Sequence, residues 1–304
     1  MKKYVISSFV IFVFIVLSFI LSPQTVSTTK ITIDIILNVI LPTLFPLMLL
    51  TLLFIEFGGV EIFAFLFQKV AGKLFGISGE GFCSFLSGLL GGSPLGAMVL
   101  YDLMDKKMIS LKEGQKLFNI AAYISPGFIL VTLSTLNNTP MLAITYYLTI
   151  VLILILSGFF YQDEVSYFDL EALKTKLKQR YKNLQVAPMI ILIIKKASIS
   201  LLIISGTMVL FNLPYVFFNQ FLDNKLAIFL SGLFEFSKGS ILLISNKDLL
   251  SYLGVIIILS WGGIAMLFQN ASYAYHNIKI KPYVITRVCS IILNLILFYL
   301  FYSF

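Results

Sequence analysis

An acid and a base stand three residues apart in an apolar part of the chain, where charged side chains are costly. Glu235 and Lys238 lie in the stretch FLSGLFEFSKG at residues 229–239, with Ser237 between them. A charge at membrane depth costs roughly 2.5–3.5 kcal/mol on insertion scales, so such residues usually serve a function. We expect Glu235 to couple to an ion or a proton, and Lys238 to hold an anionic group of a solute. The alternative is that both lie at the outer interface and pair with each other.

A second apolar stretch, FLSGLLGGSPLG at residues 85–96, contains residues that interrupt a helix. In lipid, broken backbone survives only where protein buries it or where it lines a wet cavity. The backbone N–H groups at the start of a half-helix could bind an anion or a dipole. The residues expected to do so are Gly91, Gly92, Ser93 and Pro94. Tight packing of helices through small residues is the alternative.

Two further apolar runs are interrupted, the first at Ser125, Pro126 and Gly127 and the second at Trp261, Gly262 and Gly263. Carbonyls freed at these breaks could coordinate a cation, and Trp261 could stack on a planar solute. As an alternative, Trp261 belongs to the interfacial aromatic belt. Gln269 could gate or bind, or could simply be polar because it ends a helix.

The composition excludes several classes of protein. Of the 304 residues, 59% are hydrophobic and 12% are charged, against roughly 25% charged in a soluble domain. Two cysteines and one histidine argue against a disulfide framework or a multi-histidine metal centre. The chain has no P-loop, H-E-x-x-H or G-x-S-x-G motif. We therefore expect a polytopic membrane protein that is not an enzyme and has no cofactor.

The expected fold is all-α, with about seven full spans and two re-entrant helical hairpins arranged in two inverted repeats. Residues 1–30 form a first span and, from residue 22, a polar outer loop. The first repeat covers residues 31–161, with its hairpin at 77–103. An amphipathic cytoplasmic linker follows at 162–187, and the second repeat covers 188–304, with its hairpin at 225–247.

Internal similarity supports the duplication. The pattern F-L-S-G-L-x-x-x-S at residues 85–93 recurs at 229–237, and F-x-x-A-x-Y at 118–123 recurs at 268–273. Either match alone could arise by chance in so biased a composition, but the two occur in the same order. Duplications of this kind are typical of transporters.

The positive-inside rule orients the halves. If both broken stretches are re-entrant, the N-terminus lies inside and most of the 22 lysine and arginine residues gather there. Only Lys30, Lys225, Lys238 and Lys247 remain outside. The first hairpin then enters from inside and the second from outside. Because the basic residues gather on one membrane face, the net charge of +8 does not indicate nucleic acid. If the first broken stretch instead crosses the membrane, this asymmetry weakens.

Four short motifs in this order carry a family resemblance. They are GGSPLGA at 91–97, GLFEFSKG at 232–239, SWGGI at 260–264 with Gln269, and KPY at 281–283. They resemble the YlbJ-type sporulation integral membrane proteins of the nucleoside-recognition (Gate) group, which is similar to the cores of concentrative nucleoside transporters. The resemblance implies hairpins and broken helices that meet at a central substrate site, and transport of a small polar or anionic solute. In spore formers the family is associated with moving dipicolinate toward the forespore. A neutral residue is common in the family where Lys238 stands.

The residues and the resemblance together predict a secondary transporter of the cytoplasmic membrane, working by alternating access around Ser93, Pro126, Glu235, Lys238 and Trp261. Its solute would be nucleoside-like or dipicolinate-like, and its coupling ion Na⁺ or H⁺. The expected partners are the solute and membrane lipid, with a homo-oligomer left open and no nucleic acid. The alternative is a non-transporting assembly or sporulation scaffold whose basic inner helix recruits a partner.

Overall fold

The structure is a computed structural model that describes residues 2–121, 123–133, 140–160, 167–182 and 184–302. These residues form helices and no strand. Five helical segments among them are long and apolar enough to cross a membrane, namely Ser22–Phe75, Pro140–Ser157, Val186–Phe221, Leu249–Ala271 and Ile280–Phe301. The chain is therefore a helical membrane protein, as its composition predicts. The predicted first span and the apolar run that is interrupted at Ser125 are not among these five, so the count of seven remains a prediction.

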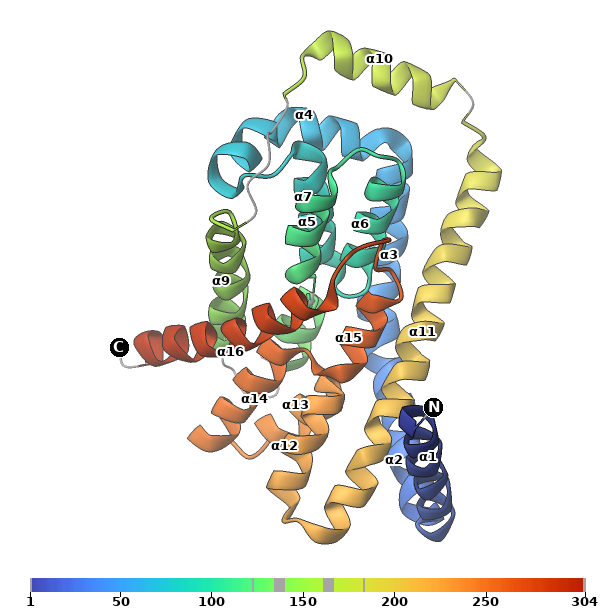
Figure 1. Cartoon of the computed structure of the whole chain (residues 1–304), viewed down its shortest axis with the longest axis vertical. Coiled ribbons are helices and arrows are strands. Elements are labelled where there is room, and N and C mark those ends of the chain that lie inside the picture. The colour runs from blue at the N-terminus through green and yellow to red at the C-terminus, as the bar shows by residue number, and fades with distance from the viewer. Residues whose placement is uncertain (1, 122, 134–139, 161–166, 183, 303–304) are drawn as a thin grey trace.

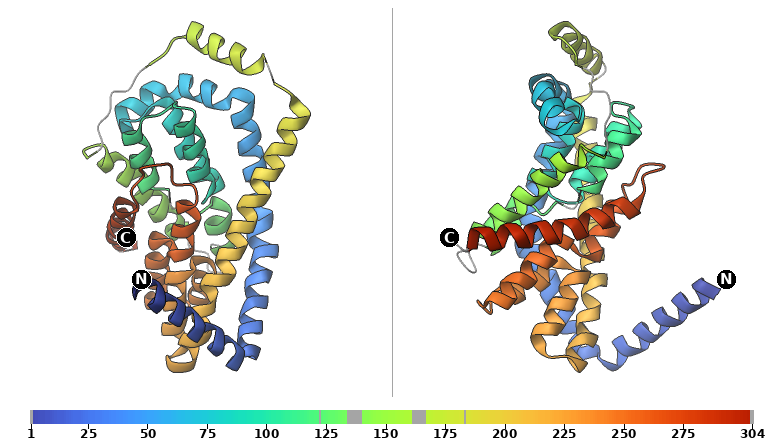
Figure 2. Two further views of the ribbon diagram at one scale, coloured as in Figure 1. Left: turned by 45° about the vertical axis from the view of Figure 1, so that its right-hand side comes forward. Right: turned by 60° about the vertical axis from the view of Figure 1, so that its left-hand side comes forward.

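The N-terminal part is a long helical column with one arm. The arm, α1 (Lys2–Ile20), points away from the body, as the right-hand view of Figure 2 shows. The column consists of α2 (Ser22–Ile35), the π-helical turn η1 (Ile36–Ile40) and α3 (Leu41–Phe54).

The prediction of an outer loop at residues 22–30 is wrong, because α2 covers them. Pro23 stands in the first turn of α2, where its missing N–H has no cost. Thr28 and Thr32 are buried where α2 packs along α11 (Val186–Phe221). Thr28, one of the polar residues that suggested a loop, therefore belongs to the packing face of a helix.

The column bends at η2 (Ile55–Gly59), where Gly58 has a φ of 86°. This left-handed conformation favours glycine. The next elements, α4 (Val60–Val70) and η3 (Ala71–Phe75), run across one end of the molecule, at the top of Figure 1.

The amphipathic segment of the linker forms α10 (Leu170–Tyr181), which lies outside α4 at the same end (Figure 1). Arg180 pairs with Glu61 of α4, its Nε 2.9 Å and its Nη2 2.5 Å from Oε1. The Tyr181 hydroxyl donates to the Phe57 carbonyl at 2.7 Å. These contacts fix α10 over the bend between α3 and α4. The predicted boundary at residues 161 and 162 lies outside the described residues.

Two pairs of short helices occupy the predicted hairpins. The first hairpin consists of α5 (Gly79–Gly91) and α6 (Leu95–Asp105), and the second of α12 (Asn224–Phe234) and α13 (Phe236–Ile244). The first lies in the upper half of Figure 1 and the second in the lower half, and both tips point toward the middle. The helix breaks predicted from glycine and proline in the first hairpin are confirmed.

Glycine pairs let the two arms of each hairpin touch. A Cβ built on Gly96 would lie 2.8 Å from the Gly88 Cα, and one built on Gly239 would lie 2.4 Å from the Gly232 Cα. Side chains at these positions would hold the arms apart. Both halves of the chain thus use the same device.

The remaining helices surround the hairpins. They are α7 (Leu111–Asn119), η4 (Gly127–Leu133), α9 (Pro140–Ser157), α14 (Leu249–Trp261), α15 (Gly263–Ala271) and α16 (Ile280–Tyr302). Residues Ala121, Tyr123, Ile124 and Ser125 between α7 and η4 are not helical, and α14 ends where Gly262 and Gly263 have φ values of 82° and 81°. Both predicted interruptions are therefore present as breaks in the helices. In Figure 1, α16 crosses the molecule at mid-height.

Candidate functional site

The tip of the first hairpin is joined to both halves of the chain. Gly92 has a φ of 75°, and the peptide between Ser93 and Pro94 is cis. The Ser93 N–H donates to the Tyr123 carbonyl at 2.8 Å. The Ser93 hydroxyl donates to Asn270 Oδ1 at 2.7 Å. Ser93 thus links the first hairpin to the first interrupted helix through its backbone and to α15 through its side chain.

Asn270 is fully buried and uses both ends of its amide. Its Nδ2 donates to the Ala121 carbonyl at 3.2 Å and to the Tyr283 hydroxyl at 3.4 Å. Because it contacts the tip, the first interruption and α16, Asn270 is the hub of this polar centre. Asn270 is not among the site residues expected from the sequence.

The carbonyls of the first interruption already accept hydrogen bonds from the chain. Those of Ala121 and Tyr123 accept from Asn270 and Ser93, and that of Ile124 accepts from the Tyr147 hydroxyl at 3.0 Å. The Ser125 carbonyl accepts from the N–H groups of residues 128 and 129 at 3.1 and 3.2 Å. Each of these carbonyls thus has at least one donor without any cation.

The other two residues of this interruption have packing positions. Pro126 is half-buried and stands next to η4, which begins at Gly127. A Cβ on Gly127 would lie 3.0 Å from the Thr43 Cβ of α3. Gly91, at the end of α5, is buried. A Cβ added there would overlap the Leu95 side chain.

At the tip of the second hairpin, Glu235 caps the start of α13. It is 0% exposed. Its Oε1 accepts from the Ser237 N–H at 3.1 Å, and its Oε2 from the Ser237 hydroxyl at 2.8 Å and the Lys238 N–H at 3.1 Å. Asn212 Nδ2 of α11 donates to the same Oε2 at 3.3 Å. A carboxylate at this position also suits the positive end of the helix dipole.

Lys238 is also 0% exposed, but no residue in the described part of the chain forms a hydrogen bond with its Nζ. The Nζ lies 4.0 Å from the centre of the Tyr215 ring of α11, a cation–π geometry. The direct ion pair between Glu235 and Lys238, which was the alternative to a functional role, is not formed in this structure.

The second interruption is tied to the second tip. Trp261 Nε1 donates to the Leu233 carbonyl at 2.9 Å, so the indole is used within the chain. A Cβ on Gly263 would lie 3.0 Å from the Phe234 carbonyl oxygen. Gln269 Nε2 donates to Thr207 Oγ1 of α11 at 2.7 Å. Each hairpin tip therefore lies against the interruption of its own half.

The two halves meet around a small internal cavity of about 20 Å³. Four residues of the predicted site line it, namely Gly92, Ser93, Ser125 and Gln269, together with apolar side chains such as Met208 and Phe236. This volume holds roughly one water molecule. The cavity lining does not include Gly91, Pro94, Pro126, Gly127, Glu235, Ser237, Lys238, Trp261, Gly262 or Gly263.

The predicted site residues thus form two clusters. One is the central cavity at the first tip, and the other is the Glu235 and Lys238 cluster between α13 and α11. The second cluster depends on Asn212 and Tyr215, which the sequence analysis did not identify. Asn212 is a polar residue in the apolar run of α11, and that is the only signal by which it could have been found.

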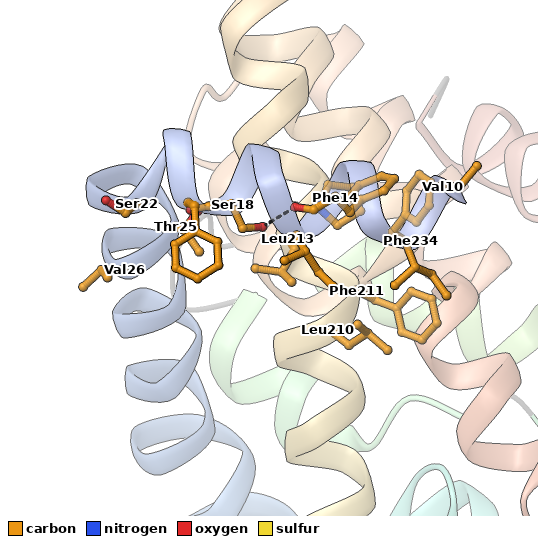
Figure 3. A pocket seen from close by; sticks show the side chains of 14 residues that line it. Val10, Phe14, Ser18, Ser22, Thr25, Val26, Leu210, Phe211, Leu213 and Phe234 are labelled. Carbon is orange, nitrogen blue, oxygen red and sulfur yellow. Dashed lines mark hydrogen bonds between the residues drawn. The ribbon is translucent and has the colours of Figure 1, made fainter. Parts of the chain in front are cut away.

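A larger hollow elsewhere has no chemistry for a polar solute. It has a volume of about 640 Å³ and lies between α1 and α11, as Figure 3 shows. It is lined by apolar side chains such as Val10, Phe14, Leu210 and Phe211. The Ser18 hydroxyl, which also lines it, donates to the Phe14 carbonyl at 2.8 Å. Such a surface suits lipid acyl chains.

Among the described residues, no group of three or more His, Cys, Asp or Glu side chains could hold a metal ion. Comparisons with protein-family models, curated proteins and solved structures each give no match to this chain.

Proposed function

We propose that this chain is a secondary transporter that moves a small polar or anionic solute, nucleoside-like or dipicolinate-like, by alternating access. The observation that carries the proposal is that each hairpin tip lies against the interrupted helix of its own half, so that four backbone breaks stand beside buried polar side chains. Discontinuous helices paired in this way form the substrate sites of many transporters. Glu235 and Lys238 are also fully buried, and ionisable residues at membrane depth usually mark a functional site.

The proposal includes an inverted arrangement of the two halves. Hairpins of similar sequence approach the centre from opposite ends of the molecule (Figure 1). With the N-terminus inside and the chain in the cytoplasmic membrane, the first hairpin would enter from the cytoplasm and the second from outside. The sporulation link rests on the family resemblance alone.

The described conformation would be an occluded one. A cavity of about 20 Å³ admits no nucleoside or dicarboxylate, so transport requires the tips to separate. The hydrogen bond between Ser93 and Asn270 and that between Gln269 and Thr207 join elements that would then move apart.

Uptake into proteoliposomes tests the proposal. The solutes are nucleosides, pyridine and aliphatic dicarboxylates, and amino acids, each with and without Na⁺ and proton gradients. Saturable uptake of one class would support the transporter and identify its cargo. Lack of flux for every solute, from protein that is folded and inserted, would refute it.

Glu235→Gln should abolish this uptake, because the amide lacks the charge that caps α13. The matched control is Glu171→Gln, a change of the same kind on the exposed first turn of α10. Emission of Trp261, the single tryptophan, reports whether the second hairpin is folded in each variant.

The scaffold alternative makes a different prediction. If the chain recruits a partner through its basic inner helix, deletion of residues 167–182 should have the largest effect and Glu235→Gln little. Arg180 and Lys176 of that helix are already paired with Glu61 and Glu80, which leaves fewer charges for a partner. This observation favours the transporter.

A further inference from the structure

Four hydrogen-bond donors of the chain already engage the Glu235 carboxylate, one at Oε1 and three at Oε2. These donors are the Ser237 N–H and hydroxyl, the Lys238 N–H and Asn212 Nδ2. Three of these four come from the first turn of α13 itself. Na⁺ bound at Oε2 would therefore compete with the N-terminal cap of α13.

Lys238, in contrast to Glu235, has no hydrogen-bond partner for its side chain among the described residues. An ammonium group has three donors, yet among the described residues none of them reaches an acceptor. Its charge is supported only by the Tyr215 ring at 4.0 Å and by the nearby Glu235 carboxylate. A neutral amine needs no such support, so this site suits both protonation states. Most buried lysines, in contrast, are paired.

No other charged group of the described chain competes with this arrangement. Among the described residues, no ion pair includes Lys238. The other titratable or charged side chains on the elements that pack around α13 are Tyr215, Lys195 and Lys196 of α11, Lys225 of α12, and Tyr252 of α14 with its cap Asp248. Lys225 and Asp248 pair with each other at 2.8 Å, and Lys195 and Lys196 lie more than four helical turns along α11 from Asn212.

We propose that Lys238 is the proton-binding group of this transporter and that its coupling ion is H⁺ rather than Na⁺, an inference that rests on the proposed transport function. The protonated ammonium attracts the Tyr215 ring and holds α13 against α11. When the amine gives its proton to water, this attraction is lost and the second hairpin is free to leave α11. The hydrogen bonds of the Glu235 cap lie within α13, so the hairpin stays folded while it moves.

The first test compares driving forces in proteoliposomes held at zero membrane potential, with each solute of the panel above. With one proton per solute, a gradient of about one pH unit changes the accumulation ratio by up to about tenfold. We expect this change in the wild type, and a ratio independent of the pH gradient in both Lys238→Met, which is never charged, and Lys238→Arg, which always is. Lys247→Met, which changes an exposed lysine just after the same hairpin, should keep the wild-type response.

Each outcome has a definite meaning. Accumulation driven by Na⁺ and lost in Glu235→Gln would overturn the inference while supporting transport. A Lys238→Met protein that still follows the pH gradient would overturn it as well. Exchange of labelled for unlabelled solute at equal pH measures transport without coupling, so a failure of the proposed function is seen there first.

A second measurement needs no solute. The indole of Trp261 bonds to the Leu233 carbonyl, two residues before Glu235, so its emission reports on the second hairpin. We expect the emission to titrate between about pH 6 and pH 9, below the usual ionisation of tyrosine, in the wild type and in Lys247→Met but not in Lys238→Met. Identical titrations in all three proteins would show that Lys238 does not bind the proton.

Discussion

The glycine contact inside the second hairpin gives the sharpest structural prediction. A Cβ added at Gly239 would lie 2.4 Å from the Gly232 Cα and 2.9 Å from the Gly232 nitrogen. Carbon atoms pack at about 3.5–4.0 Å, and the obstacle is backbone, which cannot rotate away. In Gly239→Ala the arms α12 and α13 must therefore separate by about 1 Å or more.

The expected loss of stability follows from this overlap. Overpacking of a filled core costs about 1–3 kcal/mol, occasionally more, which outweighs the gain of up to about 1 kcal/mol from replacing glycine by alanine in a helix. Gly206 of α11 is the matched control, because a Cβ built there meets nothing within 4 Å. Gly206→Ala should therefore be neutral or more stable by up to about 1 kcal/mol. Because both variants gain the helix propensity of alanine, they should differ by the overpacking cost alone, roughly 1–3 kcal/mol.

Reversible unfolding in mixed detergent micelles, followed by circular dichroism and by Trp261 emission, measures both variants. Uptake of the transported solute should fall in Gly239→Ala and stay unchanged in Gly206→Ala. If Gly239→Ala is as stable as Gly206→Ala, the arms do not touch at Gly232 and the geometry of the hairpin is refuted. Gly96→Ala offers an independent repeat in the first hairpin, where the Gly88 Cα is 2.8 Å away.

Three further predictions concern hydrogen bonds and ion pairs. A double-mutant cycle with Ser93→Ala and Asn270→Ala should give a coupling of about 1 kcal/mol in unfolding experiments; additive effects would contradict the bond. The hydrogen bond from its lysine partner lowers the pKa of Asp248 to about 2 from the usual 3.8, so this carboxylate stabilises the fold above pH 3.8, and the stabilisation is lost as the pH falls toward about 2. The unfolding midpoints of the wild type and Asp248→Asn should thus differ at pH 7 and converge near about pH 2; a constant difference would refute the pairing. Arg180→Gln leaves a buried carboxylate unpaired and should cost about 3–5 kcal/mol, whereas the exposed Lys178→Gln should stay within about 0.5 kcal/mol; equal effects would show that α10 is not anchored there.

The helix breaks could be predicted from the sequence because they follow from local chemistry. A glycine pair with positive φ values ends α14, and Gly92 and Pro94 separate α5 from α6. These preferences belong to the residues themselves and need no knowledge of the neighbours. The first hairpin could be located for the same reason, and the second because its sequence repeats part of the first.

The partners at the breaks could not be predicted, because they come from distant parts of the chain. Ser93 and Asn270 are 177 residues apart, and nothing local to Asn270 distinguishes it from a loop asparagine. The loop predicted at residues 22–30 failed for a related reason. Threonines such as Thr28 are polar in sequence, but they become a packing face once α11 lies beside them. The role of Glu235 as a helix cap also could not be predicted from the sequence, which suggested ion coupling. The structure shows that its carboxylate caps α13.

The distribution of hydrogen bonds indicates which parts would move together. Within the second hairpin, three of the four bonds to Glu235 come from α13, and only that from Asn212 crosses to α11. Within the first, the Ser84 hydroxyl of α5 donates to the Gly96 carbonyl of α6 at 3.3 Å. Separating a tip from its neighbours breaks only a few hydrogen bonds. Each contributes a net stabilisation of about 0.5–1.5 kcal/mol, so the separation costs little free energy. Unfolding a hairpin would instead disrupt the contact between its two arms at the glycine pair and, in the second hairpin, the helix cap as well. We therefore infer that opening would carry each hairpin as a rigid unit, and that the side-chain hydrogen bonds to be broken are those of Ser93, Asn212 and Gln269.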